Sequence, residues 1–366
     1  MLYRAIGIMS GSSLDGLDIA FAAFQENGGK WSYEIKETAC YGYNEEWINR
    51  LTSATSLNAK EYQLLHADYG HYIGQKVKEF IEDRKLQYQV GLIASHGHTT
   101  FHLPGKKMTA QLGDGAAIAA ETGLPVVTDL RALDVALGGQ GAPIVPIGEM
   151  LLMNGYDYFL NIGGIANISV NTDSYIAFDI CPANRVLNML ANDIGELYDN
   201  GGIIAASGNI NSLLLEKLNQ LDYYRQPYPK SLSNDFGTDI VYPVIKESGC
   251  SIPDALRTFV EHIAIQVQNA ITNLTPGSRP PAQNSRLMTT GGGAFNRFLI
   301  QQIKEKFKQL QVEVIVPDAN LVCYKEAMIM AFIGVLRWRQ EYNVLSSVTG
   351  AAKDSIGGAL WTGQEA

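Results

Sequence analysis

The sequence predicts an α/β protein built from two similar domains, and three observations carry this prediction. At 366 residues the chain is longer than one ordinary domain. Short β-rich runs alternate with apolar stripes at helical spacing. The same order of elements also occurs twice, because strand–glycine turn–strand segments at 3–24 and 157–170 are each followed by a strand that ends in a polar turn. We therefore expect two related domains that face each other across a cleft, where ligands commonly bind.

In the first half, three β-rich runs at 3–9, 16–24 and 32–43 predict a meander of antiparallel strands. Apolar residues from Tyr62 to Ile81 recur at helical spacing and predict a helix within 59–86. The other elements expected here are a buried strand in 90–100, an Ala-rich helix in 114–123 and a strand in 124–131.

The second half begins with the strand–turn–strand segment 157–170 and a strand in 174–184 that ends in a polar turn. Two helical stripes follow, and a glycine turn precedes the second one. The elements expected after 184 are a helix from Leu256 to Ile271, a strand and glycine turn in 286–296, a helix from Phe295 to Leu310, a strand in 312–317 and a helix in 325–342.

Composition excludes several classes of protein. Hydrophobic residues make up 46% of the chain and charged residues 18%, as in soluble globular proteins. A net charge of -9 argues against nucleic acid as a partner. The four cysteines are scattered, so neither a disulfide framework nor a cysteine zinc site is indicated. We see no secretion signal and no apolar run long enough for a bilayer, and we expect a cytoplasmic protein without a membrane partner.

Three glycine-rich turns are candidates for binding a nucleotide. "MSGSS" and "NIGGIAN" can direct several backbone N–H groups at a phosphate, although one such loop alone is more often an ordinary hairpin turn. Their matching places in the two halves favour a phosphate clamp. "TTGGGAFN" has more glycines than a tight strand–helix turn needs, which favours a nucleotide at the helix N-terminus. Neither a P-loop motif nor a Rossmann fingerprint is present.

Carboxylates and histidines supply the remaining candidate chemistry. Asp179 ends an apolar strand, as suits a general base or a magnesium ligand, although an acid at a strand end is often a turn former. Asp15 and Asp18 lie beside the first glycine turn. The segment "SHGHTTFH" holds three histidines, at positions 96, 98 and 102, for which hydrogen bonding to substrate is favoured over a zinc site, although any one of them alone is equally explained as a structural histidine.

Read together, these blocks resemble the anhydro-N-acetylmuramic acid kinase family over nearly the whole chain. The blocks that carry the resemblance occur in the family's order: "GIMSGSSLDGLD", "SHGHT", "QLGDGAAIA", "LGGQGAPIVP", "NIGGIANIS", "AFDICPAN", "YPKSLSNDFG", "TGGGAFN" and "KEAMIMAFIG". The resemblance implies the fold of sugar kinases, Hsp70 and actin, in which two RNase H-like domains with mixed five-stranded sheets close on ATP around an interdomain cleft. It implies a first domain of 1–133 plus 334–366 and a second of 134–333 that carries the nucleotide loop.

The family's activity is implied in the same way. Such a kinase opens the 1,6-anhydro ring of anhydro-N-acetylmuramic acid with water and phosphorylates O6, using ATP and Mg²⁺, to recycle cell-wall sugar. A homodimer is the family expectation. Asp179 matches the catalytic acid that activates the water, and Asp15 is the candidate metal residue. The other matching positions are Ser10, Gly11, Ser12 and Asp15 in the first phosphate loop, Gly163, Gly164 and Asn167 in the second, Gly291, Gly292 and Asn296 in the nucleotide loop, and His96, Arg131, Asp134 and Glu326 on the substrate side.

Some positions depart from the family's pattern. "FDICPAN" has Cys181 and Ala183 where glycines are usual, and Asn188 stands where an aspartate is usual. His98 replaces a glutamine, Ser12 replaces a threonine, and "KSLSNDFG" lacks the usual Gly-Arg-Glu. These departures keep open a kinase of another anhydro sugar, such as a levoglucosan-like compound. The shared fold alone also allows a non-sugar ATPase of the actin or Hsp70 type.

Overall fold

The computed structural model describes residues 1–11, 14–171, 175–228, 230–233, 235–274 and 284–363. The chain divides into two compact units, Met1–Asn154 with Tyr324–Ala366, and Gly155–Cys323. These boundaries differ from those expected at 133/134 and 333/334. The segment after 133 stays with the first unit because α5 (Pro146–Leu152) packs on the C-terminal part of the chain, where the Lys325 ammonium donates to the buried Glu149 carboxylate at 2.7 Å.

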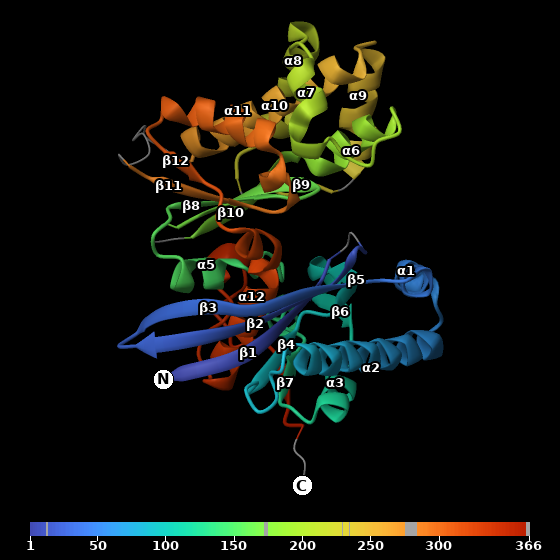
Figure 1. Ribbon diagram of the computed structural model, residues 1–366, viewed down its shortest axis with the longest axis vertical. Coiled ribbons are helices and arrows are strands. Elements are labelled where there is room, and N and C mark those ends of the chain that lie inside the picture. The colour runs from blue at the N-terminus through green and yellow to red at the C-terminus, as the bar shows by residue number, and fades with distance from the viewer. Residues whose placement is uncertain (12–13, 172–174, 229, 234, 275–283, 364–366) are drawn as a thin grey trace. The chain divides into compact units, whose positions relative to one another are not determined.

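The first unit is built on a six-stranded mixed sheet in the order β13-β7-β4-β1-β2-β3 (Figure 1). The predicted meander is confirmed, since β1, β2 and β3 pair antiparallel, and β4 and β7 then continue parallel to β1. The expectation of five strands is wrong for this unit, because β13 near the C-terminus pairs antiparallel with β7. The strands are β1 (Leu2–Ser10), β2 (Gly16–Asn27), β3 (Lys30–Gly42), β4 (Leu92–Ser95), β7 (Val126–Thr128) and β13 (Ala359–Trp361).

Helices cover this sheet as the sequence predicts. The stripe in 59–86 forms α2, which begins with a capping box between Asn58 and Glu61. Its buried residues, including Tyr69, Ile73 and Phe80, pack with β1 and β2 residues in one core. The remaining elements of the unit are α1 (Glu45–Thr52), α2 (Ala59–Asp83), the hairpin β5 (His98–Leu103) and β6 (Met108–Leu112), α3 (Gly115–Thr122), α4 (Ala132–Ala136) and α13 (Ser346–Thr349).

The second unit repeats the arrangement of the first. Its five-stranded sheet has the order β10-β9-β8-β11-β12, in which β8, β9 and β10 pair antiparallel and β11 and β12 run parallel to β8. Strands β1, β2, β3, β4 and β7 have the same order and directions. The internal repeat and the RNase H-like fold class are therefore confirmed. The strands are β8 (Tyr158–Ile162), β9 (Ile165–Val170), β10 (Ile176–Pro182), β11 (Arg286–Thr290) and β12 (Glu313–Ile315).

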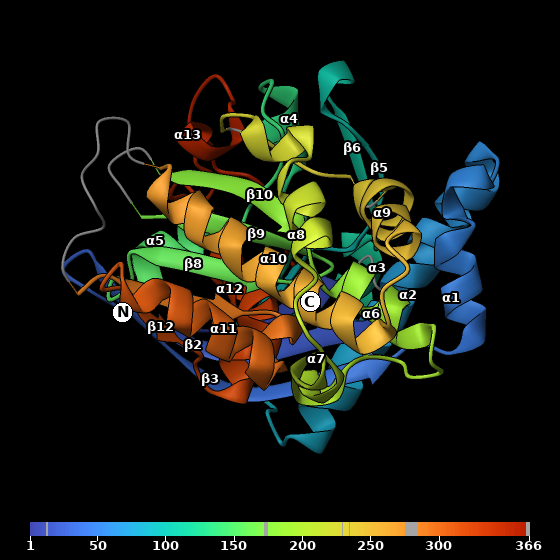
Figure 2. The ribbon, with the colours of Figure 1, turned by 90° about the horizontal axis from the view of Figure 1, so that it is seen from above.

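The helical stripes predicted for the second half form α10 and α11. Figure 2 shows α10 crossing the strands of this sheet, and its buried Phe259 and Ile263 share one core with Leu160 and Ile168 of the sheet. The helices are α6 (Asn184–Asn192), α7 (Ile203–Ser207), α8 (Ser212–Asn219), α9 (Tyr242–Glu247), α10 (Ile252–Thr272) and α11 (Arg297–Lys308).

Helix α12 (Ala319–Trp338) is more apolar than the sequence analysis recognised. In the described part of the chain it is the one helix that is long and apolar enough to cross a membrane. In the structure, 72% of the most apolar 18-residue stretch of this helix is buried, as is typical of a helix in a protein core. Gly334 brings α12 close to β4, since a Cβ there would lie 2.6 Å from the Ala94 Cβ.

Candidate active site

The first phosphate loop connects β1 to β2. Ser10 is the last residue of β1, and its buried hydroxyl lies 3.1 Å from Nδ1 of His98. Gly11 follows, and its carbonyl accepts from the N–H of Leu14 at 3.4 Å. Asp15 is exposed just before β2 begins. Ser12 lies outside the described residues.

Three carboxylates gather beside this loop. Burial raises the pKa of Asp18, on β2, to about 6, a hydrogen bond with Cys40 opposes the rise, and the charges of Asp15 and Glu326 add to it. Within the described residues no three acidic, histidine or cysteine side chains surround one point closely enough to hold a metal alone. Mg²⁺ needs no such cage, because it is usually held by one or two carboxylates together with phosphates and water. The oxygens of Asp15 and Asp18 therefore fit this ion.

The raised pKa of Asp18 predicts a pH-dependent effect of Asp18→Asn on stability. The pKa of Asp18 is higher in the folded protein than in the unfolded chain, so ionisation of this carboxyl destabilises the fold. The free energy of unfolding is therefore unaffected by this ionisation below about pH 4, and it decreases as the pH rises through about 6. The asparagine at this position cannot ionise, so the variant avoids this loss. The Tm of the variant minus the Tm of wild type should therefore be a few degrees larger at pH 7.5 than at pH 4.5. Thermal unfolding of the metal-free protein at both values measures this. An equal difference at the two pH values contradicts it.

His96 and Arg131, both predicted on the substrate side, contact each other. The Arg131 Nε–H donates to Nε2 of His96 at 2.7 Å, and Nδ1 of His96 lies 2.8 Å from the Gly97 carbonyl. Burial and the Arg131 charge lower the pKa of His96 to about 3, so its imidazole is neutral. Arg131 also donates to the Gly141 carbonyl. Burial lowers the pKa of Arg131, and the nearby negative charge of Glu326 opposes this fall. His96 thus orients Arg131, which is the better placed of the two for an anionic substrate group.

Asp134 has a structural environment. One carboxylate oxygen accepts from the Gly141 N–H and the other from the Thr349 hydroxyl, both at 2.7 Å. A Cβ on Gly139 would lie 2.3 Å from the same carboxylate. Asp134 therefore holds the glycine-rich segment 138–141 against α13, and Gly141 of this segment also accepts a hydrogen bond from Arg131.

The three histidines of "SHGHTTFH" do not share a metal. His96 contacts Arg131, His98 contacts Ser10, and Nδ1 of His102 lies 3.1 Å from the Thr109 hydroxyl. Each side chain is directed to a different partner in the described structure. The geometry thus argues against a zinc site shared by the three histidines, and the contacts that it shows are to protein groups.

In the second unit a row of polar side chains crosses three strands. Asn161 on β8 is opposite Asn167 on β9, which in turn is opposite Asp179 on β10. Residues opposite each other on neighbouring strands point to the same face of a sheet. Sequence reasoning included Asn167 and Asp179 but missed Asn161. The signal was available, because Asn161 and Asn167 flank a glycine turn symmetrically.

Asp179 sits at an irregular point of β10. Its pairing with β9 shifts between Asp179 and Cys181, so the strand bulges there, as strands often do beside active sites. The Leu232 N–H donates to the Asp179 carboxylate at 2.9 Å. Burial raises the pKa of this carboxyl, and the Leu232 N–H opposes the rise. The carboxylate is thus half-buried and held by one fixed donor.

The segment that holds Asp179 was missed by sequence reasoning. The Asp179 N–H donates to the Lys230 carbonyl at 3.1 Å, and the Tyr223 hydroxyl donates to the Asp179 carbonyl at 2.6 Å. The Lys230 ammonium lies 4.5 Å from the centre of the Tyr223 ring. The first two hydrogen bonds fix the main chain of Asp179, and the Leu232 N–H fixes its side chain. In the sequence, "YPKSLSNDFG" stands out as a block of the family resemblance, but nothing in its pattern indicates a contact with Asp179.

The departures at 181 and 183 do not place side chains in the site. Cys181 and Ala183 are both fully buried in the hydrophobic core of the second unit. Burial raises the pKa of the Cys181 thiol, although nearby Lys230 opposes the rise. Asn188 is exposed on α6. The core accommodates these two side chains, so they do not extend onto the face of β10 that carries Asp179.

The second phosphate loop, Gly163 and Gly164, also caps a helix. The Gly163 carbonyl accepts from the Asn184 N–H at 3.0 Å, and the Gly164 carbonyl accepts from the Ala183 N–H at 2.8 Å. The turn is therefore attached to the start of α6, where backbone N–H groups would otherwise lack partners.

At two of the three glycines of the nucleotide loop, close packing leaves no room for a side chain. A Cβ on Gly291, which has φ 80°, would lie 2.5 Å from the Asn161 side-chain oxygen, and one on Gly293 would lie 2.2 Å from Ile162. At Gly292 the nearest atom would be 3.5 Å away, which is ordinary contact. Asn296 accepts from the Leu299 N–H at 3.0 Å and thus caps α11. Only Gly292 leaves open space that a ligand could use.

This difference predicts opposite results for two alanine substitutions. Gly292→Ala should fold with unchanged Tm but bind ATP about tenfold more weakly, a loss of about 1.4 kcal/mol, because its methyl group occupies space kept for the nucleotide. Gly293→Ala should lower Tm instead, because its Cβ overlaps Ile162. Calorimetric ATP titration and thermal unfolding measure both. If Gly292→Ala binds ATP as tightly as wild type, this loop does not contact the nucleotide.

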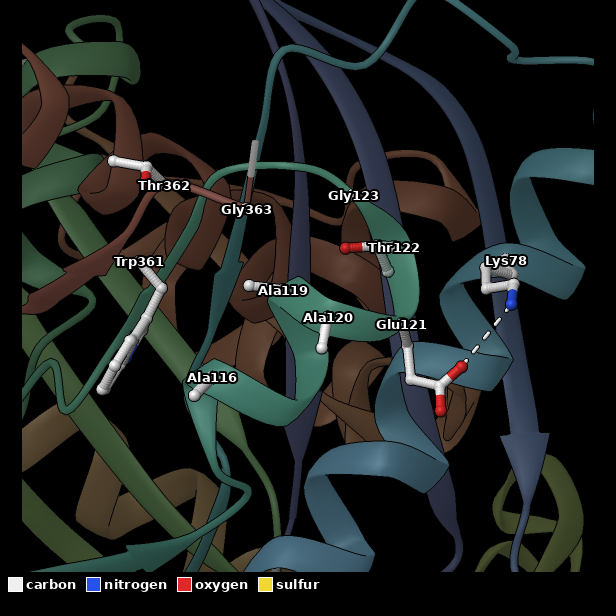
Figure 3. A pocket seen from close by; sticks show the side chains of 10 residues that line it. All are labelled: Lys78, Ala116, Ala119, Ala120, Glu121, Thr122, Gly123, Trp361, Thr362 and Gly363. Atoms are coloured by element: carbon white, nitrogen blue, oxygen red, sulfur yellow. Dashed lines mark hydrogen bonds and ion pairs between the residues drawn. The ribbon is translucent and has the colours of Figure 1, made fainter. Parts of the chain in front are cut away.

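The first unit also has a hollow on its surface. It has a volume of about 660 Å³ and lies over α3, between Lys78 and the C-terminal Trp361 (Figure 3). Its floor is formed mainly by alanines, and the Lys78 ammonium lies 3.5 Å from the Glu121 carboxylate at its rim. None of the predicted site residues lines it.

Comparison with known proteins decides the family. A family model described as anhydro-N-acetylmuramic acid kinase matches residues 3–363. The chain belongs to this family. An anhydro-N-acetylmuramic acid kinase from Sulfurovum sp. (strain NBC37-1) is 32% identical over 370 residues, covering 98% of this chain and 99% of the relative. One from Photobacterium profundum is 31% identical and covers 98% of each chain.

Among solved structures, the chain is similar to the activator of the 2-hydroxyisocaproyl-CoA dehydratase from Clostridium difficile with bound ADPNP. The identity is 13%, with a TM-score of 0.45, and the match covers 92% of this chain and 96% of that one.

Proposed function

We propose that this member of the anhydro-N-acetylmuramic acid kinase family is an ATP-dependent kinase that opens and 6-phosphorylates 1,6-anhydro-N-acetylmuramic acid. The observation that carries the proposal is Asp179. Its carboxylate is half-buried, is fixed by the Leu232 N–H and shares one sheet face with Asn161 and Asn167. A carboxylate in this setting suits a general base for water beside polar groups that bind a reacting ligand.

The reaction balances with this one base. Asp179 accepts a proton from water, and the water oxygen bonds to the anomeric carbon. The bond between that carbon and O6 breaks, and O6 attacks the terminal phosphoryl group of ATP. ADP leaves, and the products are N-acetylmuramic acid 6-phosphate and ADP. A positioned base of this kind contributes about 10²–10⁴-fold to rate.

The other predicted residues supply binding and charge. The loops at Ser10–Gly11 and Gly163–Gly164 and the open face of Gly292 would contact the nucleotide. Arg131, oriented by His96, is a partly buried cation for an acidic substrate group such as a sugar carboxylate. Bound with ATP near Asp15 and Asp18, Mg²⁺ would neutralise charge on the phosphates. We also propose a cytoplasmic homodimer, as the family resemblance implies.

One observation supports the alternative that the substrate is another anhydro sugar. His98 stands where the family has glutamine and lies against Ser10. In contrast, Cys181 and Ala183 are buried in the core and give no support to a changed sugar pocket.

A substrate panel tests the proposal. Purified protein is incubated with Mg·ATP and either anhydro-N-acetylmuramic acid, levoglucosan or no sugar, and ADP and sugar phosphate are measured. We expect a 6-phosphate from the first sugar only. If levoglucosan alone is phosphorylated, the proposed substrate is wrong but the proposed type of reaction, phosphorylation of an anhydro sugar, is retained. ADP release independent of any sugar would favour the ATPase alternative.

A further inference from the structure

Four buried residues of the first unit form a continuous chain of hydrogen bonds that ends at the first phosphate loop. Tyr69 on α2 lies 2.6 Å from the hydroxyl of Tyr43, which follows β3. The Tyr43 hydroxyl donates to Oγ of Ser10 at 2.9 Å, and Ser10 Oγ lies 3.1 Å from Nδ1 of His98. The four residues come from β1, α2, β5 and the segment after β3, and all four side chains are buried.

The protons along this chain can be assigned in order. A tyrosine hydroxyl has one proton, and Tyr43 gives its proton to Ser10, so Tyr69 must donate to Tyr43. Ser10 then receives one hydrogen bond and has one proton of its own to give. Nδ1 of His98 lies within reach as an acceptor. Burial raises the pKa of both tyrosines, and that of Tyr43 to about 12, so both remain donors across the neutral range.

We infer that this chain, from Tyr69 through Tyr43 and Ser10, fixes His98 as the tautomer with its proton on Nε2, and that His98 donates this proton to an oxygen of the ligand bound at the Ser10 loop. A neutral imidazole has one donor and one acceptor nitrogen, and the hydrogen bond at one nitrogen determines the role of the other. His98 then offers one N–H donor, as a glutamine side-chain amide would. Tyr43 is a positioning residue that acts through Ser10.

The identity of the ligand rests on the proposed function, since the oxygen belongs either to the sugar or to a phosphate of ATP. The two sources share one chemistry, acceptance of a neutral N–H donor. They differ in which Michaelis constant changes when the donor is lost, so kinetics with each substrate varied separately distinguishes them.

The tautomer is tested without substrate. In ¹⁵N-labelled protein at pH 7.5, long-range proton–nitrogen correlation spectra report which imidazole nitrogen carries hydrogen, and the signals that disappear in His98→Gln identify this residue. We expect a protonated Nε2 and an unprotonated Nδ1 for His98. A proton on Nδ1 overturns the inference, whether or not the protein is a sugar kinase.

The ligand contact is tested with matched variants. His98→Gln should keep KM for both substrates within about threefold, whereas His98→Leu should raise one of them at least about tenfold. Tyr43→Phe should change the His98 Nδ1 shift and raise the same KM about fivefold, with little change in kcat. The control is Tyr62→Phe, which removes a similar hydroxyl contact, 2.6 Å from Thr100, outside the chain. Equal effects of His98→Gln and His98→Leu, or of the two tyrosine variants, contradict the assignment.

If no anhydro sugar is turned over, the same variants are compared by calorimetric titration with a non-hydrolysable ATP analogue. Weaker binding in His98→Leu but not in His98→Gln then supports a phosphate contact. Unchanged binding in both, with the proton on Nδ1, removes the proposal independently of the function.

Discussion

Replacing Asp179 by asparagine should reduce sugar phosphorylation to a small residual rate and leave ATP binding intact. The expected fall in kcat is about 10²–10⁴-fold, because an amide cannot accept the proton of the attacking water. The substituted side chain keeps an oxygen that can accept from the Leu232 N–H, so the loop that holds it should stay in place. Turnover is measured by ADP release with anhydro sugar, and ATP affinity by calorimetric titration.

The control for this variant is Asp83→Asn, which makes the same chemical change at an exposed carboxylate at the end of α2. It should retain wild-type kcat and KM. If Asp179→Asn turns over sugar at the wild-type rate, Asp179 is not the base. If the variant loses ATP binding as well as turnover, the substitution has disrupted the site and the loss of turnover is not evidence for proton transfer by Asp179. The ATP titration is therefore carried out before the turnover assay.

Replacing Gly7 by alanine should be the most damaging small substitution in the first unit. A Cβ at this buried position of β1 would lie 1.8 Å from the Ala327 carbonyl oxygen and 2.5 Å from the Ala331 nitrogen. Both atoms belong to the backbone of α12, so no side-chain rotation can relieve the overlap. Overpacking of a rigid core typically costs about 1–3 kcal/mol, and we expect the upper end or more. The Tm should fall by roughly 10 °C.

The same substitution tests whether α12 must lie close to β1 for function. Glu326 precedes Ala327 on this helix and is near Asp18 and Arg131. Moving α12 outward should therefore also lower kcat/KM at temperatures where the protein is still folded. Gly105→Ala is the matched control, because no atom lies within 4 Å of the Cβ position there. Unchanged Tm in Gly7→Ala would mean that the helix shifts at no cost.

Much of the candidate site was accessible from sequence because its residues belong to short local motifs. Ser10, Gly163 and Gly291 each lie at or directly after the end of a strand, and glycine turns at strand ends are visible in a linear pattern. Asp179 was found for the same reason. Asn161 could have been found, because a hairpin places it opposite Asn167.

Other residues could not be predicted because their partners are distant along the chain. Asp134 resembles a substrate residue in its motif, yet its carboxylate is occupied by Gly141 and Thr349. Leu232 and Tyr223 contact Asp179 from a segment that has no periodic pattern. Their roles depend on a loop path, and a loop path is not encoded by local propensity.

The sequence by itself determined the fold class, the internal repeat and the glycine turns, because strand and helix periodicity and turn chemistry are local properties. It also placed Asp179 at the end of a buried strand. Only the tertiary structure decided which donors reach that carboxylate, which glycines serve packing, and how Tyr69, Tyr43 and Ser10 line up behind His98. These features arise from close contacts between segments far apart in the chain, and a hydrogen bond or an overlap is settled by tenths of an ångström that no linear pattern contains.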